Sequence, residues 1–116
     1  MKRLASIVCA LSLALVPVAV QADTAAGKAI YDKSCASCHG ADGRGNADKA
    51  KLLKIDAATL NLGRDEVASQ TKDEKKAITM NGKARMPAYG KKMSEADVDS
   101  AMDYVMELIA AIRGKK

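Results

Sequence analysis

The chain has 116 residues but no tryptophan and no phenylalanine, so three tyrosines are its only aromatic residues. A domain of this length buries only about 60–65% of the surface that its unfolded chain exposes, and its hydrophobic core is correspondingly thin. The sequence is short of the bulky apolar side chains that usually fill a core. A bound apolar group would fill the core. The composition also leaves open a helix bundle packed with small aliphatic residues and methionine.

Histidine occurs only once in the chain, and cysteine three times. A structural zinc site takes four ligands, and only two cysteines lie near the single histidine. The 19 basic and 14 acidic residues give a net charge of +5, which is a mild basic bias. The basic residues are not interleaved with aromatic side chains that stack on bases, so we expect no nucleic-acid binding.

Residues 1–22 have the pattern of a secretory signal peptide, with a basic start, an apolar run and the small residue Ala22 at the expected cleavage site. The run falls short of the roughly 20 apolar residues that span a bilayer, which makes a retained anchor the weaker alternative. We therefore expect export to the periplasm, loss of Cys9 with the leader and no stable membrane insertion after cleavage. The mature domain is expected to span residues 23–116.

Hydrophobic periodicity and helix-capping signals predict an all-α domain of about four helices, without strands or internal repeats. A capping box at Thr71 and Glu74 opens one helix, and Ser94 is the expected N-cap of the last one. The predicted segments are, in order, a helix at 25–35, a glycine-rich loop at 40–51, short turns or a helical piece at 52–62, a helix at 71–80, a loop at 82–90 and a last helix from 95. The apolar stripe of the last helix is expected at Val98, Met102, Val105, Ile109 and Ile112, with Met106 on or near it.

The segment Cys35-Ala36-Ser37-Cys38-His39 matches the attachment signature of c-type haem. Two thiols three residues apart at a helix end can reach the two vinyl groups on one edge of the porphyrin, and His39 then supplies a neutral imidazole to the iron. A thioredoxin-like redox pair would require a βαβ context that the pattern does not show. A disulfide between the two cysteines is the remaining alternative.

A methionine is expected to be the second axial ligand, because the chain has no second histidine. Met86 is followed by Pro87, which keeps it out of helical geometry, and it lies in a loop bracketed by glycines. Met93 is the second candidate and Met80 the third. Haem with His39 and Met86 as iron ligands is therefore the predicted site.

The chain resembles the class I bacterial cytochromes c, which are small electron carriers with one haem. The resemblance lies in "GKAIYDKSCASCHGADGRG", "AITMNGKARMPAYG" and "DVDSAMDYVMELI", and it extends over nearly all of the mature chain. It implies thioether attachment of the haem at Cys35 and Cys38, with His39 as proximal ligand and Met86 as distal ligand.

The same resemblance implies that the first and last helices cross, with Gly27 and Tyr31 against Ala101 and Tyr104. One departure concerns the loop after the haem signature. Many relatives have a proline there, near the carbonyl that accepts the hydrogen bond of the axial histidine, and this chain has none. The partner of the His39 side chain is therefore left open by the sequence.

Filling both axial positions leaves no site for oxygen or peroxide, so the predicted function is one-electron transfer and not catalysis. We expect a monomer with an acidic redox partner that docks on basic residues near Met86, namely Lys83, Arg85, Lys91 and Lys92. A solvated surface without a docking role is the alternative for these residues. Two other functions stay open: a subunit of a larger respiratory enzyme, and a sensor or peroxidase-like domain with a labile methionine.

Overall fold

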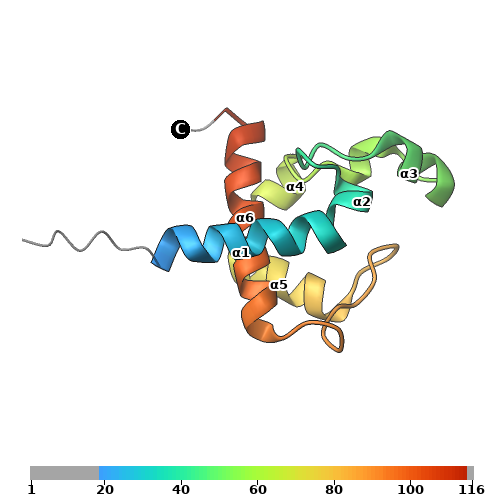
Figure 1. Cartoon of the computed structure of the whole chain (residues 1–116). Coiled ribbons are helices and arrows are strands. Elements are labelled where there is room, and N and C mark those ends of the chain that lie inside the picture. The colour runs from blue at the N-terminus through green and yellow to red at the C-terminus, as the bar shows by residue number, and fades with distance from the viewer. Residues whose placement is uncertain (1–18, 115–116) are drawn as a thin grey trace, which may run out of the picture.

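In the computed structural model, residues 19–114 are described, and no strand occurs among them (Figure 1). The all-α prediction is confirmed, with four longer helices joined by shorter ones. The elements are α1 (Ala19–Ser34), α2 (Ala36–His39), α3 (Ala47–Leu53), the 3-10 helix η1 (Ala57–Leu60), α4 (Asp65–Ala68), α5 (Lys72–Asn81) and α6 (Glu95–Ile112). Residues 1–18, most of the predicted leader, lie outside the described residues, and its last four residues form the start of α1.

Helices α1 and α6 cross at the centre of the fold (Figure 1). Gly27 lies so close to α6 that a Cβ atom on it would clash with the carbonyl oxygen of Ser100 and lie 3.1 Å from the Cβ of Tyr104. The rings of Tyr31 and Tyr104 meet edge to face, with centroids 5.3 Å apart. The predicted crossing is thus confirmed, but Gly27 faces the Ser100 carbonyl and not Ala101.

We expect Gly27→Ala to destabilise the protein by about 2–3 kcal/mol, because neither of two packed backbones can move away cheaply. Helix propensity alone predicts the opposite, a gain of about 1 kcal/mol. Chemical denaturation of the haem-loaded protein measures the difference, with Ala29→Gly at an exposed α1 position as the control that reports propensity alone. A Gly27→Ala variant as stable as the parent would contradict the close approach.

The core is built from one face of α6 packed against α1 and α4. Its buried members are Tyr31, Val67, Val98, Ala101, Met102, Val105 and Ile109. The predicted stripe is confirmed for four of its five positions, while Ile112 is only half-buried and packs against Gly63. Met106 was expected on or near the stripe, but its side chain is 39% exposed.

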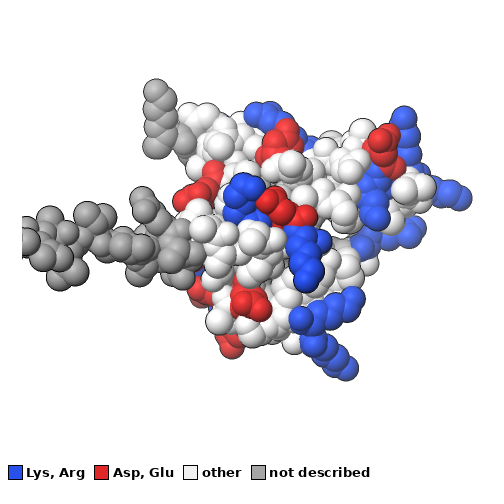
Figure 2. Space-filling model, viewed as in Figure 1, with Lys and Arg blue, Asp and Glu red and all other residues white. Residues whose placement is uncertain are grey.

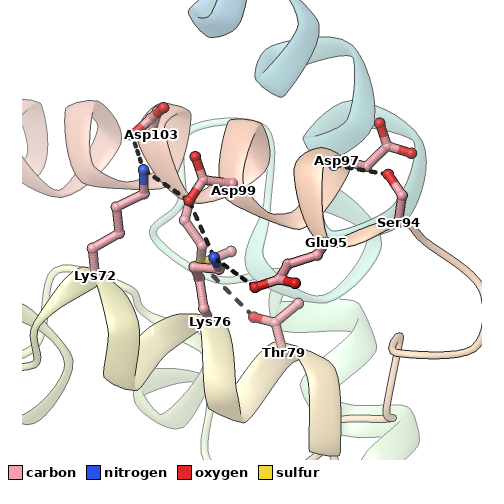
Figure 3. Close-up of polar contacts among 9 residues, drawn as sticks. Lys72, Lys76, Thr79, Ser94, Glu95, Asp97, Asp99 and Asp103 are labelled. Atoms are coloured by element: carbon pink, nitrogen blue, oxygen red, sulfur yellow. Dashed lines mark hydrogen bonds and ion pairs between the residues drawn. The ribbon is translucent and has the colours of Figure 1, made fainter.

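Helix α5 is held against α6 by a network of ion pairs (Figure 3). The Nζ atom of Lys72 lies 2.7 Å from a carboxylate oxygen of Asp103 and 3.1 Å from one of Asp99, and Lys76 approaches Asp99 at 3.3 Å. The hydrogen bond from Lys72 is the main reason why the pKa of Asp99 is lowered. Such exposed pairs stabilise little individually. Their effect is to align α5 on α6 and so fix where the following segment begins.

The ends of α5 and α6 agree with the predicted caps. The full capping box of Thr71 and Glu74 is present, and the Ser94 hydroxyl accepts from the Asp97 amide. Helix α3 is a correction, because it begins at Ala47, inside the predicted loop at 40–51. The Asn46 side chain caps it, accepting hydrogen bonds from two backbone amides.

Candidate haem site

Cys35 lies between α1 and α2 and Cys38 lies within α2, so the two cysteines share one helical turn. The Cys35 amide still donates to the Tyr31 carbonyl at 2.8 Å, and the Cys35 carbonyl accepts from the amides of Cys38 and His39 at 3.2 and 3.0 Å. Both thiols are free, so the disulfide alternative is not observed. Burial, followed by the neighbouring Cys38, raises the pKa of Cys35 to about 11, which keeps this thiol uncharged at neutral pH.

The imidazole of His39 is oriented by a backbone carbonyl. Its Nδ1 atom lies 2.9 Å from the Leu60 oxygen, and donation to that oxygen leaves the lone pair on Nε2. Burial lowers the pKa of His39, and the charge of Arg64 lowers it further, although the bond to Leu60 acts in the opposite direction. A neutral imidazole with a free Nε2 is the form that binds haem iron.

Leu60 is the partner that the sequence left open. It ends η1 and is 92% buried, with a relative exposure of 8%. The amide of Leu62 donates to the Gly43 carbonyl at 2.8 Å, which ties this segment to the loop that follows His39. The role of Leu60 is not visible in the sequence, because any residue supplies a backbone carbonyl.

A hydrogen bond from Tyr31 holds the end of the cysteine turn in place. The hydroxyl of the fully buried Tyr31 donates to the Gly40 carbonyl at 2.6 Å, and Gly40 has a φ of +82°, which an L-residue rarely adopts. The amides of Gly45 and Asn46 donate to the carbonyls of His39 and Cys38. The loop therefore folds back onto α2 and satisfies its C-terminal carbonyls.

Met86 lies in the segment between α5 and α6. Its amide and carbonyl pair with those of Lys83 at 2.9 and 3.0 Å, closing a tight turn in which Ala84 has a φ of +52°. The Tyr89 hydroxyl donates to the Ser34 carbonyl at 3.0 Å, directly before Cys35. This bond ties the Met86 segment to the cysteine turn, and both lie at the same end of the molecule in Figure 1.

Four other methionines lie within the described residues. Met102 is buried in the core, Met80 and Met93 pack against the core, and Met106 is exposed on α6. Met86 is half-buried but is not among the residues packed on that core. Among the described methionines, only Met86 and the exposed Met106 are not packed on the core, and Met86 is the one in the segment that is tied to the cysteine turn.

The thiols and the imidazole of the cysteine turn fit a c-type haem. Cys35, Cys38 and His39 supply two thiols and a neutral imidazole with a free Nε2 within five consecutive residues. Among the described residues, no three histidine, cysteine or acidic side chains group as they would around a metal ion held by the protein alone. The cysteine turn with its oriented histidine and the all-α fold together are those of a c-type cytochrome.

Comparison with known proteins makes the assignment specific. The sequence model of the family described as "Cytochrome C oxidase, cbb3-type, subunit III" matches residues 22–105. Cytochrome c6 of Leptolyngbya boryana is 38% identical over 86 residues, covering 74% of this chain and 93% of that protein. Cytochrome c6 of Rippkaea orientalis (strain PCC 8801 / RF-1) is 32% identical over 112 residues, covering 91% of this chain and 93% of that protein.

The chain belongs to this family and is a class I c-type cytochrome. It carries one covalently bound c-type haem and acts as an electron carrier with redox partners. Within residues 19–114, no helix is long and apolar enough to cross a membrane.

Proposed function

We propose that the mature domain, residues 23–116, is a periplasmic one-electron carrier with its haem attached through Cys35 and Cys38. His39 and Met86 are the axial ligands in this proposal. The single observation that carries it is the bond from His39 to Leu60, which presents Nε2 with its lone pair free. The haem supplies one-electron exchange at its iron, and the chain contributes the two ligands that fill the axial positions.

The ligand pair favours electron transfer over catalysis. A thioether is a soft donor that favours ferrous iron and raises the reduction potential relative to two histidines. With both positions filled, oxygen and peroxide have no site, so the proposed activity is not enzymatic. The tyrosine contacts of the site support this role, because the hydroxyls of Tyr31 and Tyr89 hold the turn and the loop in fixed places.

A basic surface surrounds the Met86 segment. We call Lys83, Arg85, Lys91 and Lys92 the basic rim, and all four are exposed. Figure 2 shows lysine and arginine side chains gathered at the end of the molecule that carries α3 and this segment. Lys49, Lys51 and Lys54 of α3 and its C-cap add to the positive charge there. We propose that an acidic redox partner docks at this end, with the protein acting as a monomer.

Charge reversal on the basic rim tests the docking proposal. We expect Lys91→Glu combined with Lys92→Glu to slow electron transfer to an acidic acceptor by about tenfold at low salt, because long-range attraction speeds encounter. The parent rate should also fall steeply as salt shortens the Debye length from about 10 Å at 0.1 M to about 3 Å at 1 M. Stopped-flow kinetics across a salt series measures both effects.

The control for this test is Lys28→Glu, an exposed α1 residue outside the basic rim. It should change the rate much less than the double reversal. If the rate is indifferent to salt and to the rim substitutions, the rim is only solvated surface.

A second candidate, a subunit of a larger respiratory enzyme, is favoured by the matching family, which is that of subunit III of a cbb3-type cytochrome c oxidase. Gel filtration of a native extract separates the two. A carrier elutes at the size of the free domain, whereas a fixed subunit elutes with a much larger complex.

A further inference from the structure

Tyr89 connects the segment that carries Met86 to the cysteine turn. Its hydroxyl donates to the Ser34 carbonyl at 3.0 Å, and Ser34 directly precedes Cys35. Within the part of the chain that the structure describes, this is the one hydrogen bond that joins residues 82–93 to residues 34–45. The hold of this segment on the cysteine turn therefore depends, as far as hydrogen bonds go, on a single phenol group.

The backbone of Tyr89 is fixed on a different part of the fold, namely α5. The Tyr89 amide donates to the Thr79 carbonyl at 2.9 Å, and the Gly90 amide donates to the Met80 carbonyl at 3.0 Å. A Cβ atom on Gly90 would lie 2.9 Å from the Met80 carbonyl oxygen, so the two backbones are in close contact. Tyr89 thus belongs to the α5 side of the site, and its hydroxyl reaches across to the end of α1.

Met86 lies three residues before Tyr89 in a stretch of backbone with little internal freedom. Its amide and carbonyl are paired with those of Lys83, and the amides of Gly82 and Tyr89 bond both ends of the stretch to α5. Pro87 has a fixed φ. An outward movement of Met86 therefore carries the stretch with it, and that movement separates the Tyr89 hydroxyl from the cysteine turn.

We propose that Tyr89 is a positioning residue whose hydroxyl, by bonding to Ser34, keeps the thioether of Met86 on the iron; this inference rests on the proposed ligation by His39 and Met86. Opening of the stretch breaks the bond to Ser34, so the bond lowers the population of the open state in which the iron accepts other ligands. One half-buried hydrogen bond favours the closed state by about fivefold. Tyr89 acts only through Met86 and does not bind the iron itself.

Tyr89→Phe in the haem-loaded ferric protein tests this proposal. The substitution keeps the ring and the contact with the Lys92 ammonium group, whose Nζ lies 5.9 Å from the ring centroid, and removes only the hydroxyl. Added cyanide binds during transient opening, so its binding rate is proportional to the population of the open state. We expect stopped-flow absorption to show a rate about fivefold higher than in the parent protein, with the methionine–iron charge-transfer band retained before cyanide is added.

The matched control is Tyr104→Phe, which removes a hydroxyl from a half-buried tyrosine packed against Tyr31 at the crossing of α1 and α6. It should bind cyanide at the parent rate, even if chemical denaturation shows that it loses as much stability as Tyr89→Phe. A Tyr89→Phe rate no higher than that of the control overturns this proposal and leaves the proposed ligation standing. A parent protein without the methionine–iron band overturns both, so the two failures are distinguishable.

Discussion

Replacing Met86 by alanine is expected to abolish the methionine–iron charge-transfer band of the ferric protein and to open the iron to carbon monoxide and cyanide. The reduction potential should fall on the order of 0.1 V, because the axial ligand is one of the main determinants of haem potential. Absorption spectra with and without added ligand, followed by redox titration, measure the three changes. The alternative function, a sensor or peroxidase-like domain, predicts instead that the parent protein already binds these ligands.

Met93→Ala is the matched control, since it removes a thioether from the same segment. Met93 packs against the core, so its loss should cost about 2 kcal/mol of stability while the band and the closed iron are retained. Met80→Ala should behave in the same way, because Met80 also packs against the core. If Met93→Ala loses the band and Met86→Ala keeps it, the ligand assignment is wrong.

The parts of this fold that sequence analysis predicted well are those set by local chemistry. The caps at Thr71 and Ser94 depend on side chains and amides within one helical turn, so their residue types identify them. The cysteine turn is similarly local. Helix α3 was missed because the three glycines before it suggested an extended loop, although the capping side chain of Asn46 was visible in the sequence.

The remaining features depend on contacts between distant segments. The carbonyl of Leu60 meets His39 from 21 residues away, and a carbonyl carries no sequence signature. The hydrogen bond from Tyr89 to Ser34 joins residues 55 positions apart, and neither residue type predicts it. The Nε atom of Arg64 is buried without a hydrogen-bond partner, and the sequence does not show the burial of a single atom. The sequence therefore yields candidate donors for the haem, which stay predictions, whereas the groups that orient the His39 ring and tie the Met86 segment to the cysteine turn become visible only in the structure.

Short helices and few large buried side chains predict that the chain is poorly folded without its haem. Among the described residues, the only large side chains that are fully buried are Tyr31 and Val98. Helices α3 and α5 have 7 and 10 residues, and isolated helices shorter than about 12–15 residues are marginal in water. Domains of this size have little surplus stability. The haem should therefore supply much of the core.

Cys35→Ala combined with Cys38→Ala is accordingly expected to yield a chain that releases haem into acid–acetone, whereas the parent protein stays red. Purified without haem, the variant should lose roughly a third or more of its helical circular dichroism and unfold without a cooperative transition, because α3 and α5 lack the packing that stabilises them. Ser37→Ala, at the exposed position between the two cysteines, is the control that should keep both haem and helicity. A haem-free variant that is fully helical and unfolds cooperatively would show that the protein core is sufficient on its own, and the composition would then describe a self-supporting helical bundle.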